Sequence, residues 1–121
     1  MENIFSCCLE ANETKLAILN NILKGNVKGW FYENDIAESL SKKGYKLYYY
    51  KISDSTLEIE FIIEKNGEVI PIEVKSWNYS TPSLNNFINK YKPSTCYKLI
   101  NGNVGVVGTK KSIPHYMILF I

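Results

Sequence analysis

Two runs of alternating apolar and polar residues near the middle of the chain predict a β-hairpin. The runs are Thr56–Glu64 and Glu68–Lys75, and the residues between them include Asn66 and Gly67. The pair Asn-Gly favours a two-residue type I′ turn, because both turn residues of that type need positive φ angles. Counting outward from this turn places Lys65 opposite Glu68 and fixes the register of the two strands.

The predicted register gathers charged side chains on one face of the hairpin. It places Glu60 opposite Glu73 and Glu58 opposite Lys75, and strict alternation puts all of these side chains on the same face. The other face receives the apolar side chains, which are Ile59, Phe61, Ile63, Ile70, Ile72 and Val74. Like charges directly opposite each other destabilise a sheet, so a divalent cation between Glu60 and Glu73 would explain the pair. The simpler alternative is a solvated face with a Glu58–Lys75 ion pair.

Apolar residues at helical spacing predict helices on both sides of the hairpin in the sequence. We expect one or two helices between Ile4 and about Lys24, and a clearer helix from about Trp30 to Lys43. Another helix begins at Ser80-Thr81-Pro82, where a hydroxyl cap precedes proline at the first helical position. Its apolar face consists of Leu84, Phe87, Ile88 and Tyr91.

The remaining segments predict further strands and a fold class. Strands are expected at 45–52, 95–100 and 104–107, and an extended segment at 113–121 whose Pro114 is typical of an edge or a strand start. The order of elements predicts an α/β or α+β fold with one central mixed sheet. We further predict an N-terminal helical extension at 1–28 and one domain at 29–121.

Composition and charge narrow the class of protein only slightly. The chain has 121 residues, 45% hydrophobic and 21% charged, which is typical of one globular domain. Its net charge of +2 is compatible with nucleic acid but does not indicate it. No apolar run reaches the ~20 residues of a membrane span, and the start lacks a signal-peptide pattern. Cys7, Cys8 and Cys96 have no zinc-type spacing, so we expect a cytoplasmic protein with cysteines that pack as small hydrophobic residues.

Glu33 adds an acid to the predicted site. At 100° per residue it falls in the apolar stripe of its helix, with Ala37 and Leu40. A carboxylate among core positions is costly unless it is paired or coordinates a cation. The alternative is that Glu33 favours the helix dipole from the first helical turn, where such a stripe often ends in solvent.

These residues form a candidate catalytic set for metal-dependent phosphodiester hydrolysis. Mg²⁺ (or Mn²⁺) prefers oxygen ligands and keeps several waters, so Glu60 and Glu73 would suffice, with the Val74 backbone carbonyl as a candidate third ligand. Lys75 would stabilise developing negative charge or orient the attacking water. Glu33 would hold a second ion or its water.

The motif order resembles the PD-(D/E)XK restriction-endonuclease-like superfamily. Glu60 followed by Glu73-Val74-Lys75 on a hairpin, after a helix that bears a glutamate, carries this resemblance. The likeness extends to one branch, the C-terminal domain of prokaryotic AAA-type ATPases, a domain without a settled function. The segments that resemble this branch are Tyr32–Asn34, Ile36–Leu40, Lys43–Tyr49, Glu58–Phe61, Pro71–Ser76 and Ile113–Pro114.

The resemblance covers 29–121 and implies a restriction-endonuclease-like core, DNA as substrate and an ATPase domain or protein as partner. The chain departs from the family in two ways. Glu60 stands where the family usually has aspartate, and no phosphate-binding motif G-x-x-x-x-G-K-[ST] precedes Glu33. We therefore expect either an excised domain or a shortened relative.

Two other functions remain open. The same fold with an idle site would serve as a regulatory, docking or nucleic-acid-binding domain. Alternatively, the tyrosines at 48–50 and the apolar run at 116–121 would form an oligomer interface, although alternating tyrosines also pack a core. We read His115 as structural. Lys42-Lys43-Lys46 and Lys110-Lys111 would contact phosphates only if they are more than solvated surface lysines.

Overall fold

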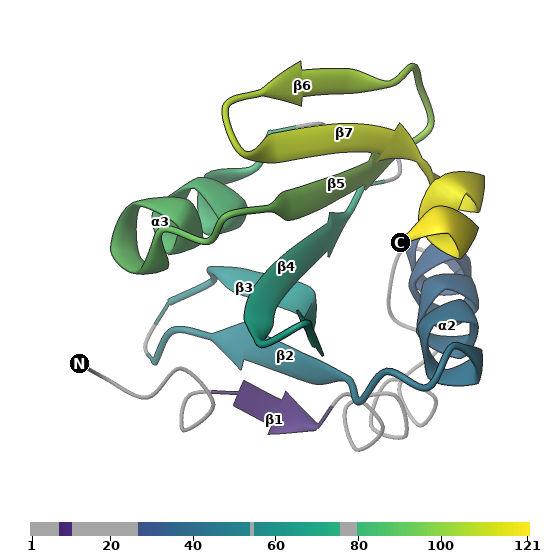
Figure 1. The fold of residues 1–121 in the computed structure, drawn as a ribbon, viewed down its shortest axis with the longest axis horizontal. Coiled ribbons are helices and arrows are strands. Elements are labelled where there is room, and N and C mark those ends of the chain that lie inside the picture. The colour runs from purple at the N-terminus through teal and green to yellow at the C-terminus, as the bar shows by residue number, and fades with distance from the viewer. Residues whose placement is uncertain (1–7, 11–26, 54, 76–79) are drawn as a thin grey trace.

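A seven-stranded mixed sheet organises the described part of the chain, with helices on both of its sides (Figure 1). The computed structural model describes residues 8–10, 27–53, 55–75 and 80–121. The elements are β1 (Cys8–Glu10), α2 (Val27–Lys42), β2 (Tyr48–Lys51), β3 (Glu58–Lys65), β4 (Glu68–Val74), α3 (Pro82–Tyr91), β5 (Cys96–Ile100), β6 (Gly105–Val107), β7 (Lys110–Pro114) and the 3₁₀ helix η3 (His115–Phe120).

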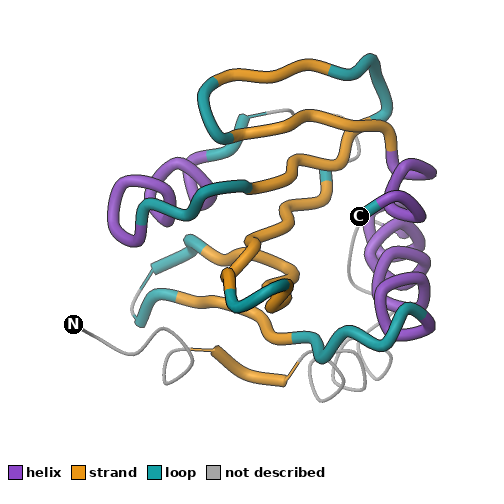
Figure 2. The backbone as a smooth tube through the Cα atoms, in the orientation of Figure 1, coloured by secondary structure: helices purple, strands orange, loops and turns teal. Residues whose placement is uncertain are grey.

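The strand order is β1-β2-β3-β4-β5-β7-β6, and the pair of strands at each edge of the sheet is antiparallel. The pairs β1–β2, β2–β3 and β3–β4 are antiparallel, whereas the pairs β4–β5 and β5–β7 are parallel. Figure 2 shows the long connection through α3 that such a parallel pair requires. The prediction of an α+β fold with a mixed sheet flanked by helices is confirmed.

The β3–β4 hairpin forms at the predicted turn. Asn66 and Gly67 have φ angles of 55° and 78°, as a type I′ turn requires. The register follows the predicted count from the Lys65–Glu68 pair outward, but the ladder ends at the Phe61–Ile72 pair. The predicted pairs Glu60–Glu73 and Glu58–Lys75 are therefore not part of it.

A β-bulge in β3 changes which side chains share a face of the sheet. Tyr48 and Tyr50 of β2 pair with Ile62 and Ile59, so the interval on β3 is one residue longer than on β2. Glu60–Phe61 is the extra step, and the alternation of side chains shifts there. Ile59 consequently packs on the α3 side together with Ile62. The prediction that Ile59 shares a face with Phe61 is wrong for this reason.

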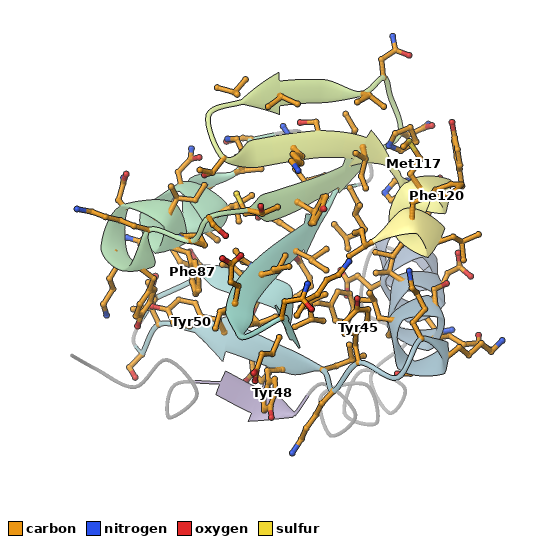
Figure 3. The ribbon with its side chains drawn as sticks, viewed as in Figure 1. Tyr45, Tyr48, Tyr50, Phe87, Met117 and Phe120 are labelled. Carbon is orange, nitrogen blue, oxygen red and sulfur yellow. The ribbon has the colours of Figure 1, made fainter. Side chains whose placement is uncertain are left out.

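The core has two parts, one on each side of the sheet. Helices α2 and η3 cover one part, whose buried residues are Ile36, Ala37, Leu40, Leu47, Phe61, Ile63, Ile70, Ile72, Val74, Leu99, Ile113, Ile118 and Ile121. Helix α3 covers the other, which contains Tyr50, Ile59, Ile62, Leu84, Phe87 and Cys96. Figure 3 shows Phe87 of α3 and Tyr50 of β2, whose rings meet edge to face with 5.2 Å between their centroids. The buried Cys96 packs as a small hydrophobic residue, as predicted.

Both long helices keep their predicted apolar faces, although their starts differ from the prediction. Helix α2 begins at Val27 rather than Trp30, so Gly29 lies inside it, and Gly44 follows its end with a φ of 87°. Helix α3 begins at Pro82 as predicted, but the Thr81 hydroxyl makes no capping hydrogen bond and instead accepts one from Lys110.

The predicted extended segment at 113–121 is wrong beyond Pro114. The chain turns there into η3, which packs against α2 (Figure 1). Lys43 Nζ donates hydrogen bonds to the backbone carbonyl oxygens of Leu119, at 2.9 Å, and of Ile121. These long-range contacts fold the segment back onto the end of α2, which local strand propensity does not anticipate.

The N-terminal segment is described only at Cys8–Glu10. These residues form β1, which pairs antiparallel with β2, so this part of the predicted helical segment is a strand. The other residues of the helices predicted between Ile4 and Lys24, and Cys7, lie outside the described residues. No helix within the described ranges has the length and apolar character needed to cross a membrane.

Candidate functional site

Glu33 lies on α2 within electrostatic reach of the hairpin. Ile36, Ala37 and Leu40 are buried on the same helix face, which confirms the predicted stripe. Burial and, to a smaller extent, the Glu58 carboxylate raise the pKa of Glu33 to about 7, although Lys75 opposes the change. The carboxyl is therefore not a plain solvated helix acid.

Glu60 lies where the two hairpin strands separate. Its Oε2 accepts a hydrogen bond from the Val74 N–H at 3.2 Å, in place of the ladder pair that the register predicts. Burial, then Glu73, then Glu33 raise the pKa of Glu60 to about 8, although this hydrogen bond opposes the change. The Glu60 carboxyl is thus the group that responds to both Glu73 and Glu33.

Glu73 is the most deeply buried acid of the set, with 1% of its surface exposed. Its Oε1 forms an ion pair with Lys75 Nζ at 3.0 Å. Its Oε2 is buried and has no hydrogen-bond partner among the described residues. Burial raises the pKa of Glu73, while Lys75, Lys98 and Lys110 act in the opposite direction. An orphaned carboxylate oxygen in this position is costly unless a cation or a proton occupies it.

The acids approach from two sides of the sheet: alternation from the buried Ile59 puts Glu58 on the α2 side, so the prediction that Glu58 shares a face with Glu73 is wrong. Ile72 and Val74 belong to the core covered by α2, so alternation places Glu73 on the α3 side. Glu33 projects from α2 on the other side. The structure brings Glu60, Glu73 and Lys75 together where the strands separate, and Glu33 lies near enough to perturb Glu60.

The donor set suits a hard divalent cation that keeps several waters. Glu60 and Glu73 offer carboxylate oxygens, and the orphaned Glu73 Oε2 is the observation that favours a cation here. Val74, the candidate carbonyl ligand, contributes its N–H to Glu60. Across the ranges that the structure describes, no group of three or more His, Cys, Asp or Glu side chains could hold a metal ion. A cation bound here would have Glu60 and Glu73 as its carboxylate ligands.

His115 contacts this site, which the sequence did not predict. Its Nε2 lies 3.0 Å from the Lys75 backbone oxygen, and its ring stacks on Tyr32 at 4.1 Å between centroids. Tyr32 precedes Glu33, so one imidazole links α2 to the end of β4. Forty residues separate His115 from Lys75, and no local pattern in the sequence signals the contact.

Lys98 and Lys110 also lie near Glu73, a position that the sequence did not predict for either lysine. Lys98 pairs with Glu73 in the parallel ladder between β4 and β5. Burial lowers the pKa of Lys98, with Lys110 and Lys75 acting in the same direction and Glu73 opposing them. The parallel pairs β4–β5 and β5–β7 bring Lys98 and Lys110 close to Glu73. The order of these strands in the sheet could not be read from the sequence.

Comparison with known proteins adds a family but no activity. The family described as "Domain of unknown function (DUF4143)" matches residues 28–117. Neither the curated proteins nor the solved structures give a significant match. The matched range contains α2 except its first residue, the hairpin, α3 and all of the site residues described above. This chain belongs to the DUF4143 family.

Proposed function

We propose that this chain is a metal-dependent nuclease-like domain that hydrolyses phosphodiester bonds of DNA. The observation that carries the proposal is the buried Glu73 carboxylate, with Lys75 at 3.0 Å on one oxygen and no partner among the described residues on the other. Glu60 adds a second carboxyl beside it. Two acids and an amine at the open end of a hairpin match the chemistry of this reaction class.

Each residue of the set has a role that follows from its position. Mg²⁺ or Mn²⁺ bound by Glu60 and Glu73 would polarise the phosphodiester and lower the pKa of a bound water. The Lys75 ammonium would stabilise negative charge that develops on the phosphate. Glu33 has a pKa of about 7, which suits a group that accepts a proton near neutral pH.

The proposal includes a restriction-endonuclease-like core, with which the mixed sheet is compatible. The acids lie on a hairpin within a mixed sheet, and helices cover both sides of that sheet. We extend the proposal to an association with an ATPase domain or protein, which rests on the resemblance alone.

The second candidate is an idle site in a regulatory, docking or nucleic-acid-binding domain. One observation favours it: a pKa of about 8 leaves the Glu60 carboxyl mostly protonated at pH 7, and a protonated carboxyl binds a cation poorly. Metal binding therefore has to displace a proton, and the balance between proton and metal separates the two candidates.

A metal titration followed by a nicking assay tests the proposal. Calorimetry with Mn²⁺ at pH 8 should detect binding to the unaltered protein and no binding to Glu60→Gln or Glu73→Gln. Plasmid nicking in Mn²⁺ should be lost in Lys75→Ala and kept in Lys51→Ala, whose exposed lysine lies on neighbouring β2. Absence of Mn²⁺ binding, together with equal plasmid integrity for the unaltered protein and Lys75→Ala, would leave only the idle site.

A further inference from the structure

Parallel strand pairing places two lysines on the same face as Glu73. Lys98 of β5 pairs directly with Glu73 of β4, and the row continues to Ser112 of β7. Lys110 pairs with Cys96 one step away, and Cys96 belongs to the core covered by α3. Side chains two residues apart on a strand share a face, so Lys98 and Lys110 both emerge on the α3 side.

Positive charge therefore accumulates across three neighbouring strands. Lys75 follows β4, and Lys98 and Lys110 lie on β5 and β7, whereas Glu73 is the acid on which all three act. Strands in a sheet lie about 4.8 Å apart and rise about 3.3 Å per residue, so Lys110, two strands away and two residues along, starts about 12 Å from Glu73. The pKa of about 8 leaves the neighbouring Glu60 carboxyl mostly protonated at pH 7, so the three ammonium groups around Glu73 leave a local excess of positive charge, which suits a polyanion that extends across the strands.

The start of α3 bounds this row of lysines. Lys110 Nζ donates to Thr81 Oγ1 at 3.1 Å and to Asn85 Oδ1 at 2.9 Å. A helix N-terminus carries partial positive charge, so a lysine held against it gains nothing from the helix dipole. An anion bound there would be attracted by the Lys110 ammonium and by the N-terminus of α3. The lysines therefore favour an anionic ligand that extends from Glu73 towards α3.

We propose that Lys98 and Lys110 bind backbone phosphates of a DNA strand that crosses β4, β5 and β7 between Glu73 and the start of α3. The inference rests on the proposed function, because it assigns the scissile phosphate to Glu73 and Lys75 and the flanking phosphates to Lys98 and Lys110. Lysine binds phosphate as a flexible point charge, so the row contributes affinity without reading the base sequence.

The chain offers a matched control on the same strand. Lys111 neighbours Lys110 on β7 but emerges on the other face, where its Nζ lies 5.9 Å from the Tyr97 ring centroid. Tyr97 packs against the core on the α2 side. Substitutions at Lys110 and Lys111 therefore remove equal charge from neighbouring positions on opposite faces of the sheet.

The test measures DNA binding without divalent metal. Fluorescence anisotropy of a labelled single-stranded DNA oligonucleotide, in EDTA over a series of NaCl concentrations, gives the slope of log K against log salt. Lys98→Gln and Lys110→Gln should each reduce the magnitude of that slope by about 0.7, and the double variant by about 1.4. Lys111→Gln should leave it unchanged. The glutamine amide can still donate a hydrogen bond at position 110, and circular dichroism is used to check that each variant is folded.

Several outcomes would overturn the inference. Unchanged slopes in Lys98→Gln and Lys110→Gln would do so, as would an equal loss in Lys111→Gln. Competition by poly-glutamate as effective as by unlabelled DNA of equal charge would assign the row to acidic peptides instead. Failure of the nuclease proposal is distinguishable: loss of slope without Mn²⁺ binding leaves the phosphate row standing, whereas Mn²⁺ binding and nicking with unchanged slopes removes the row alone.

Discussion

Glu60 links the electrostatics of the site to the stability of the fold. Burial beside Glu73 and Glu33 raises its pKa to about 8, whereas glutamate in an unfolded chain has a pKa of about 4.3. The folded protein therefore retains a proton that the unfolded chain releases. The resulting stabilisation is fully present below the unfolded pKa and is lost as the pH rises towards 8. Replacing Glu60 by glutamine should remove this pH dependence from the metal-free protein.

The magnitude follows from the separation of the two pKa values. Each pKa unit corresponds to about 1.4 kcal/mol, so between about pH 5 and pH 7.5 the free energy of unfolding should fall by about 1.4 kcal/mol per pH unit from this group. The total is on the order of a few kcal/mol. For a domain of this size, 1 kcal/mol shifts Tm by about 4 °C, so the change in Tm is on the order of 10 °C.

Thermal unfolding in EDTA from pH 5 to pH 8.5, followed by circular dichroism, measures this effect. The amide oxygen of glutamine can still accept the hydrogen bond from Val74, so Glu60→Gln should give a flatter curve and should be the more stable protein at pH 8. Glu64→Gln, which alters an exposed acid on the same strand, controls for the loss of a carboxyl group. Parallel curves for the unaltered protein and Glu60→Gln would refute the reasoning.

Three further predictions follow from neighbouring residues. Glu33→Gln should flatten the dependence of Tm on pH, but only up to about pH 7, where the pKa of Glu33 lies. An unchanged dependence of Tm on pH would contradict the burial of Glu33. Phe87→Ala removes a fully buried ring under α3 and should lower the free energy of unfolding by about 3–5 kcal/mol in urea denaturation, whereas a loss below 1 kcal/mol would contradict the packing. His115→Phe should keep the stack on Tyr32 but lose the contact to the Lys75 backbone, so nicking should fall about tenfold while the free energy of unfolding changes by about 1 kcal/mol. Full nicking by His115→Phe would show that the contact is only structural.

The best sequence predictions depend on local chemistry. The turn at Asn66 and Gly67 was predictable because a two-residue turn of this type needs positive φ at both positions. The apolar face of α3 was predictable because Leu84 and Phe87 repeat at helical spacing and both are fully buried. The same argument placed Glu33 on the buried side of its helix. Each inference needed only a few adjacent residues.

The errors occur where a distant segment decides the local conformation. The bulge at Glu60–Phe61 arises from the pairing of β3 with β2, and it separates Ile59 from the face assigned to it by alternation. The segment after Pro114 folds into η3, where Lys43, which lies far earlier in the chain, donates hydrogen bonds to its carbonyl oxygens. Strand propensity carries no information about either partner.

Local sequence patterns were enough to predict the hairpin, the helices that flank it in the chain and the acids at its open end, because turn geometry and hydrophobic periodicity act over a few residues. Only the tertiary structure decided that Glu73 faces α3 while Glu33 approaches from α2, and that Lys98 and Lys110 lie in a row beside Glu73. The physical reason is that strand order and bulges are set by pairing between segments far apart in the chain, and a shift of one residue moves a side chain to the other face.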